Sequence, residues 1–178
     1  MSTILLLGGA RSGKSYYAQE LASKRSGNVL FVATGIALDE EMTRRIQAHR
    51  RSRPPGWRTL EVTTGIGAKL LGNLAGFDTV IVDCITLLVN NIMMALPQAS
   101  SGELKAAVTD EIEQLAACFK LGPDFIIVSN EVGLGLVPED AASRAYRDLL
   151  GRANQMLAGA AEEVYFMAAG IPLRVKPA

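Results

Sequence analysis

The segment from Gly8 to Ser15 has the residue types and spacing of a phosphate-binding loop. It reads Gly8-Gly9-Ala10-Arg11-Ser12-Gly13-Lys14-Ser15 and matches the pattern G-x-x-x-x-G-K-[ST] at every specified position. Glycines let the backbone curl so that successive N–H groups point at phosphate oxygens, and a following helix adds the positive end of its dipole. Lys14 would reach the β- and γ-phosphates, and Ser15 would ligate Mg²⁺. We therefore expect a nucleoside triphosphate to bind here.

A carboxylate at the end of an apolar run has the right position to complete a magnesium site. Asp83 directly follows the run Thr79 to Val82, which we interpret as a buried strand. Ligands of parallel sheets bind at the carboxyl ends of the strands, so Asp83 is expected beside the phosphate-binding loop. Asp is also a preferred N-cap residue, and Asp83 could cap a following helix without losing the first role.

Five arginines surround the only histidine of the chain. The cluster consists of Arg44, Arg45, His49, Arg50, Arg51 and Arg53. On a helix, Met42, Ile46 and His49 would lie on one side, facing the protein. Two interpretations stay open: a solvated basic face with a partly packed histidine, or a histidine that attacks phosphorus while guanidinium groups hold the phosphates.

Short apolar runs alternate with longer amphipathic segments, which is typical of a parallel sheet covered by helices. Strands are predicted at Ile4–Leu7, Val29–Ala33, Thr79–Val82 and Phe125–Val128. Helices are predicted at about Lys14–Lys24, Asp39–Arg51, Ile66–Leu74, Ile85–Ala95, Glu103–Lys120 and Pro138–Ala160. Ser100 and Glu103 have capping-box spacing. Val164–Ala168 and Leu173–Val175 flank a turn and predict a closing antiparallel hairpin.

Length and composition favour a single α/β domain over residues 1–178. Hydrophobic residues make up 49% of the 178, enough for one sizeable core. The 18 basic residues balance the 18 acidic ones, so no overall field attracts nucleic acid or an anionic membrane. No signal peptide or apolar stretch of about 18 residues is evident, and we expect a cytoplasmic protein. Cys84 and Cys118 offer neither a disulfide framework nor metal-binding spacing.

In order and spacing, segments along essentially the whole chain resemble one family, the bifunctional adenosylcobinamide kinase/adenosylcobinamide-phosphate guanylyltransferases. The matching segments are Gly8 to Ser15, Ala33-Thr34-Gly35, Asp39-Glu40-Glu41-Met42, Arg45-Ile46, His49-Arg50, Arg53-Pro54, Trp57-Arg58-Thr59-x-Glu61, Asp83-Cys84-Ile85-Thr86 and Asn130-Glu131-Val132-Gly133-x-Gly135-x-Val137-Pro138. The resemblance implies a P-loop NTPase-like fold and a homotrimer.

The same resemblance implies two reactions with ATP or GTP and Mg²⁺. One phosphorylates the aminopropanol hydroxyl of adenosylcobinamide, a corrinoid, and the other transfers GMP from GTP to that phosphate. His49 would carry GMP as a phosphoramidate. The nucleotide site would include Gly8 to Ser15, Ala33, Thr34, Gly35, Arg50, Arg51, Ser52, Arg53, Glu61 and Asp83. A carboxylate such as Glu61 can accept hydrogen bonds from both N1–H and the 2-amino group of guanine.

Two other functions fit a phosphate-binding loop alone. One is a small-molecule kinase in which His49 is structural, and the other is a nucleotide-gated switch that orders a partner-binding loop. Both leave the surroundings of His49 and the carboxylate of Glu61 without a role.

Overall fold

One mostly parallel sheet forms the centre of the computed structural model, which describes residues 1–25, 27–37 and 39–177. Its strands are β1 (Thr3–Gly8), β2 (Val29–Ala33), β3 (Arg58–Glu61), β4 (Thr79–Asp83), β5 (Asp124–Val128), β6 (Glu163–Ala168) and β7 (Ile171–Lys176). Their order across the sheet is β3-β2-β4-β5-β1-β6-β7. Only the β6–β7 pair is antiparallel within these residues, so the predicted closing hairpin is confirmed.

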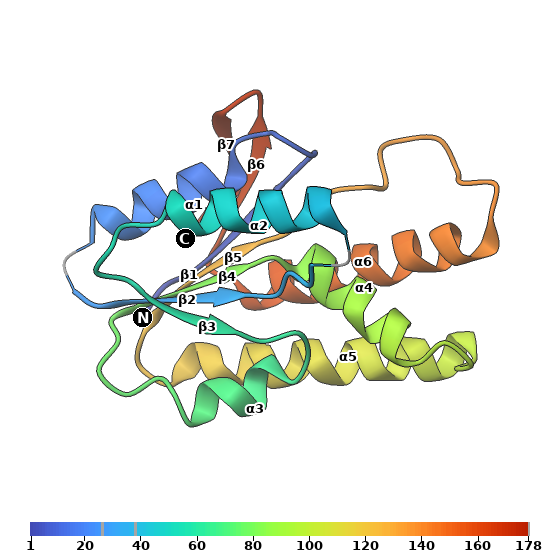
Figure 1. Ribbon diagram of the computed structural model, residues 1–178, viewed down its shortest axis with the longest axis horizontal. Coiled ribbons are helices and arrows are strands. Elements are labelled where there is room, and N and C mark those ends of the chain that lie inside the picture. Colours follow the sequence, from blue (N-terminus) through green and yellow to red (C-terminus); the bar gives the residue numbers. More distant parts are fainter. Residues whose placement is uncertain (26, 38, 178) are drawn as a thin grey trace.

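Helices cover both faces of the sheet (Figure 1). They are α1 (Lys14–Ser23), α2 (Glu40–Arg51), α3 (Ile66–Leu71), α4 (Ile85–Ala95), α5 (Ser101–Ala117) and α6 (Ala141–Ala160), with a short 3₁₀ turn, η1 (Cys118–Lys120), after α5. Helix α1 packs on one face, while α3 to α6 build the larger core on the other. The predicted α/β class with a P-loop NTPase-like arrangement is confirmed.

The central strands are apolar because both of their faces are covered. Alternate residues of β4 enter opposite cores: Val80 and Val82 pack toward α3 to α6, and Ile81 packs toward α1. The edge strand β3 was not predicted from the sequence. It is short and none of its residues is buried, so it lacks the apolar run that marked the other strands.

Side chains cap the N-termini of α2, α5 and α6, where Asp39, Ser100 and Asp140 accept backbone hydrogen bonds. The capping box of Ser100 and Glu103 is present, and it starts α5 two residues earlier than predicted. Helix α6 begins at Ala141 rather than Pro138 because the Asp140 side chain accepts a hydrogen bond from the Ser143 N–H. The residue that caps α4 is Cys84, so the alternative role of Asp83 as a helix cap is wrong.

Membrane-spanning helices are not found in the part of the chain that the structure describes: none combines the length and the apolarity that crossing a bilayer requires.

The packing of α3 against α5 requires a glycine at position 67. A Cβ atom there would lie 2.7 Å from the backbone carbonyl atoms of Gln114 in α5. We expect Gly67→Ala to lower the free energy of unfolding by about 1–3 kcal/mol, because overpacking forces the two helices apart. The measurement is urea-induced unfolding.

Gly72, at the end of the same helix, is the matched control. A Cβ at Gly72 would meet nothing within 4 Å, and its φ of −88° suits any residue. Equal effects of Gly67→Ala and Gly72→Ala would contradict this account of the α3–α5 packing.

Candidate functional site

The phosphate-binding loop joins β1 to α1 and is supported from behind by the β6–β7 hairpin. Gly8 has φ 147° and Gly13 has φ 91°, values that side chains disfavour. A Cβ at Gly8 would lie 2.6 Å from the carbonyl oxygen of Met167, and one at Gly13 would lie 3.2 Å from Gly170 Cα. The Gly170 N–H also donates to the Ser12 carbonyl at 3.0 Å. The hairpin therefore fixes the shape of the loop.

Lys14 lies on the inner side of this loop and is buried. Its Nζ donates to the carbonyl oxygens of Gly8 at 3.0 Å and Gly9 at 2.5 Å, and to Ser12 Oγ at 3.2 Å. Burial lowers the pKa of Lys14, while the nearby Cys84 and Asp83 side chains raise it. The cation is thus held within the loop, where triphosphate oxygens would meet it.

Asp83 ends β4 beside the loop, at the carboxyl edge of the sheet. Its Oδ2 is buried and has no hydrogen-bond partner among the described residues. Burial raises the pKa of Asp83, and the Ser15 hydroxyl and the charges of His49, Arg53 and Lys14 oppose this rise. An unpartnered carboxylate oxygen next to a hydroxyl is a donor set that Mg²⁺ accepts.

Protein side chains alone would not enclose such an ion. Groups of three or more His, Cys, Asp or Glu side chains suited to a metal are not found in residues 1–25, 27–37 and 39–177. A Mg²⁺ ion bound to nucleotide phosphates keeps several waters and needs only one or two protein ligands, a role that Ser15 and Asp83 would fit.

Thr34 and Asn91 fix the backbone next to Asp83. Thr34 Oγ1 donates to the Cys84 carbonyl at 2.7 Å and accepts from the Cys84 N–H at 2.8 Å. Asn91 of α4 is buried and donates from Nδ2 to the carbonyls of Thr34 at 2.8 Å and Thr63 at 3.0 Å. The segment Ala33 to Gly35 is thereby held against the edge of the sheet.

Arg53 is the arginine of the cluster that is fixed in place. Its Cζ lies 3.9 Å from the centroid of the Phe31 ring, and its Nη1 donates to Thr59 Oγ1 at 3.1 Å. Burial lowers the pKa of Arg53, and the carboxylate of Asp83 raises it. Arg53 therefore places a positive charge beside Phe31 of β2, where it interacts electrostatically with Asp83.

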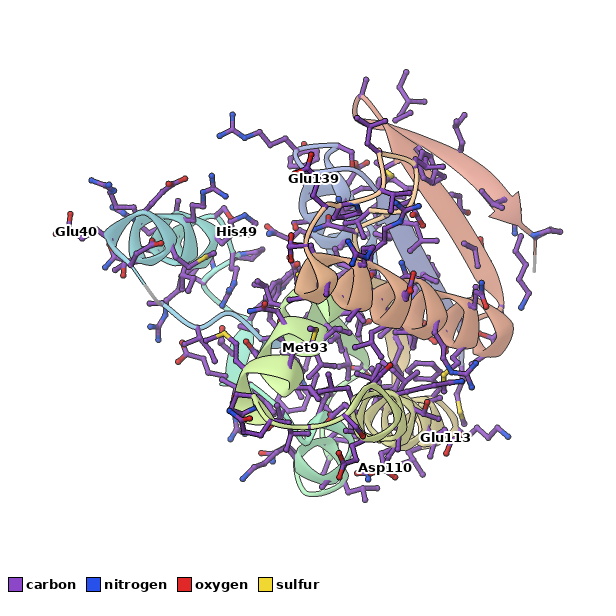
Figure 2. All side chains as sticks on the ribbon, turned by 90° about the vertical axis from the view of Figure 1, so that its right-hand side faces the viewer. Glu40, His49, Met93, Asp110, Glu113 and Glu139 are labelled. Atoms are coloured by element: carbon purple, nitrogen blue, oxygen red, sulfur yellow. The ribbon has the colours of Figure 1, made fainter. Side chains whose placement is uncertain are left out.

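Helix α2 carries His49 and none of its residues is buried. Met42 and Ile46 are half-buried, as predicted, but His49 on the same side is exposed. Ile46 packs near Gly35, where a Cβ would lie 3.3 Å from Ile46 Cδ1. Figure 2 shows His49 on the side of α2 that faces the rest of the protein, while Glu40 points away. The imidazole is close enough to lower the pKa of Asp83.

Arg50, Arg51 and Ser52, which directly follow His49, lie differently from Arg53. Arg50 forms an exposed ion pair with Glu61 of β3 at 3.7 Å. Arg51 Nε donates to the Gln47 carbonyl at 3.3 Å, and Ser52 Oγ donates to the His49 carbonyl at 2.9 Å. Arg51 and Ser52 thus form these hydrogen bonds with their own helix.

A polar network behind the loop could not be predicted from the sequence. Asn154 of α6 accepts from Ser129 Oγ at 2.6 Å and donates to the Asn130 carbonyl at 3.0 Å. The Asn130 N–H donates to Thr86 Oγ1 at 2.8 Å, which links α4 to the end of β5. Burial raises the pKa of Tyr146, which donates to the Thr86 carbonyl, to about 12. The one sequence feature that indicated buried hydrogen bonds was an amide side chain on the apolar face of a helix, which occurs at both Asn91 and Asn154.

The arrangement suits nucleotide chemistry at phosphorus. The positive charges of Lys14 and Arg53 both lower the pKa of Asp83, and the exposed imidazole of His49 lies on the side of α2 that faces the protein. Such groups stabilise charge on phosphate oxygens and offer a nitrogen nucleophile.

Solved structures share the fold at low sequence identity. The RadB recombinase aligns with a TM-score of 0.51 and 15% identity, covering 93% of this chain and 73% of that one. A protein from Pyrococcus horikoshii OT3 aligns with a TM-score of 0.57 and 8% identity, covering 99% and 86% of the two chains.

Sequence relatives are much closer. The bifunctional adenosylcobalamin biosynthesis protein CobU of Salmonella typhimurium is 41% identical over 180 residues, covering 97% of this chain and 99% of that protein. The corresponding CobP of Pseudomonas aeruginosa is 41% identical over 174 residues, covering 97% and 96%. The model of one family, described as cobinamide kinase / cobinamide phosphate guanyltransferase, matches residues 4–175. The chain belongs to the cobinamide kinase / cobinamide phosphate guanyltransferase family.

Proposed function

We propose that this protein phosphorylates adenosylcobinamide and then transfers GMP from GTP to the resulting phosphate, as one domain over residues 1–178. The observation that carries the proposal is the common location of four groups at the carboxyl edge of the sheet. Lys14 lies in the phosphate-binding loop and Asp83 ends β4, while Arg53 stacks on Phe31 of β2 and His49 lies on the side of α2 that faces the protein. A kinase alone needs no histidine at this position, because in-line phosphoryl transfer has no covalent enzyme intermediate.

In the kinase reaction, the backbone of Gly8 to Ser15 holds the triphosphate. The aminopropanol oxygen forms a bond to the γ-phosphorus, the bond from that phosphorus to the β–γ bridging oxygen breaks, and the hydroxyl proton passes to solvent or a base. Lys14 would neutralise charge that develops on the phosphate oxygens. Mg²⁺, held by Ser15 and Asp83, would supply further charge neutralisation at the β- and γ-phosphates.

In the guanylyl transfer, a ring nitrogen of His49 forms a bond to the α-phosphorus of GTP, and pyrophosphate leaves. The imidazolium loses its other N–H proton as the phosphoramidate forms. A phosphate oxygen of adenosylcobinamide phosphate then forms a bond to the same phosphorus, the P–N bond breaks, and the ring of His49 takes up a proton as it leaves. Arg50 and Arg53 would hold the phosphates during both displacements.

Glu61 would select guanine. It lies at the end of β3, in register with Ala33 of β2, and so belongs to the same edge of the sheet as the phosphate-binding loop. Its ion pair with Arg50 is exposed on both sides and therefore weak enough to yield to a base.

We also propose that the protein acts in the cytoplasm and assembles as a homotrimer. The number of subunits rests on the family resemblance. Support for self-association comes from β7, an edge strand on which Ile171, Leu173 and Val175 are 63%, 52% and 65% exposed. A row of alternate apolar side chains on a sheet edge favours burial against another chain.

Incubation with GTP labelled at the α-phosphate, followed by acid and alkali treatment, tests the covalent intermediate. A label on the protein that is lost in acid and kept in alkali is expected of a histidine phosphoramidate. Cobinamide phosphate should then remove it. Phosphorylation of cobinamide without any trapped label would indicate that the protein has only the kinase activity.

Lys14→Ala should lower both activities by about 100-fold or more, because one phosphate-binding loop serves both reactions. The measurements are rates of cobinamide phosphorylation and of guanylyl transfer. Lys24→Ala, at the exposed far end of α1, is the control. Guanylyl transfer at the wild-type rate in Lys14→Ala would argue against a shared nucleotide site.

Glu61→Gln should weaken GTP binding by about 1–3 kcal/mol more than ATP binding, because the amide loses the charge that favours the paired donors of guanine. Titration with both nucleotides measures the difference. The control is Glu113→Gln on α5, far from the site (Figure 2). Equal losses for both nucleotides would place guanine elsewhere.

His49→Asn should eliminate the covalent GMP adduct and guanylyl transfer, while cobinamide phosphorylation survives within about tenfold. The free energy of unfolding should change by no more than about 0.5 kcal/mol, because the side chain is exposed. Gln47→Asn, exposed on the same helix, is the control. Acid-labile GMP on the His49→Asn protein would exclude His49 as the nucleophile, since the chain has one histidine.

A further inference from the structure

The loop between β5 and α6 displays apolar side chains to solvent. Leu134 is 82% exposed, Leu136 is 96% exposed and Val137 is 68% exposed. Nearly complete exposure of two leucines in one short loop is costly unless the surface binds something.

Two arginines of α6 hold this loop by its backbone. Arg147 donates to the carbonyls of Gly133 and Leu136, each at 3.2 Å. Arg144 donates to the Pro138 carbonyl at 2.9 Å and to the Glu139 carbonyl. Because the loop is fastened through its carbonyl groups, its leucine side chains are left free for contact with another molecule.

The loop begins at the phosphate-binding loop. The Glu131 N–H donates to the Gly8 carbonyl at 3.0 Å, so the apolar segment starts three residues from a direct contact with the nucleotide site. Figure 2 shows Glu139 of this loop at the start of α6 and His49 on the side of α2 that faces the rest of the protein. The loop between β5 and α6 thus forms the rim of the nucleotide site. A substrate whose hydroxyl reaches the triphosphate would place the rest of its structure near this rim.

A polar cavity adjoins the loop. It has a volume of about 370 Å³, and its lining includes Glu131, Arg147, Arg152 and Gln155. These side chains offer both hydrogen-bond donors and acceptors, which is what uncharged amides require.

We propose that Leu134, Leu136 and Val137 bind the face of the corrin ring of cobinamide, and that the adjoining cavity takes its amide side chains. This inference rests on the proposed function. A corrinoid combines a broad macrocycle edged with methyl groups and a periphery of neutral amides, and the rim presents the matching pair of surfaces. A ring of this size fits against the exposed loop between β5 and α6 more readily than into an enclosed pocket.

The test compares Leu134→Ser/Leu136→Ser with wild type in two measurements. One is equilibrium binding of cobinamide without nucleotide, followed by ultrafiltration and the visible absorbance of the corrinoid. The other is steady-state kinetics of the kinase reaction. We expect the Kd and KM for cobinamide to rise about tenfold or more, since two apolar contacts are lost, with the KM for GTP and the His49 adduct unchanged.

Two further variants complete the comparison. Leu134→Met/Leu136→Met keeps the apolar area and should bind cobinamide within about threefold of wild type. Leu121→Ser is the control, because Leu121 is 50% exposed but precedes β5 at the opposite edge of the sheet.

Unchanged cobinamide binding in the serine variant would overturn the inference. So would a change in oligomeric state, by light scattering, with unchanged binding, because the loop would then be a subunit interface. A wild-type protein that neither binds nor phosphorylates cobinamide would instead overturn the proposed function.

Discussion

The carboxylate of Asp83 is the constraint on which the site depends. Its Oδ2 is buried without a hydrogen-bond partner among the described residues, and a buried charge is costly unless opposite charges lie nearby. Two such charges come from separate segments, Lys14 at the start of α1 and Arg53 before β3, and both lower the pKa of Asp83. The parallel sheet brings these segments to one edge, so the architecture offsets part of the cost of burying Asp83, whose pKa still stays above its usual value.

The phosphate-binding loop in turn depends on the end of the chain. Gly8 and Gly13 approach the backbone of the β6–β7 hairpin so closely that no larger residue fits without movement. Because β6 pairs with β1 in parallel, the last two strands of the chain pack directly against the phosphate-binding loop that follows β1. The local geometry of nucleotide binding is therefore a property of long-range strand pairing as well as of the motif itself.

The sequence predicted the fold where apolar runs are long or motifs are specific. The central strands, the closing hairpin and the Ser100 capping box needed only local patterns, whereas β3 lies at the edge without buried residues and left no such pattern. At the site, Gly8 to Ser15 and Asp83 could be placed from strand ends alone. The hydrogen bond from Asn91 to the Thr34 carbonyl and the stacking of Arg53 on Phe31 could not be predicted. Both depend on which neighbours a side chain contacts after folding.

Helix α2 has a role at the candidate site without a matching role in the hydrophobic core, although the two roles are coupled in most active sites. It carries His49, the nucleophile that we propose, yet it contributes no buried residue to either core. Local opening of such an element costs little free energy compared with global unfolding. Substitutions in α2 can therefore alter the rate and selectivity of the chemistry at little cost to thermal stability, which makes this helix the part of the protein most open to divergence and to engineering.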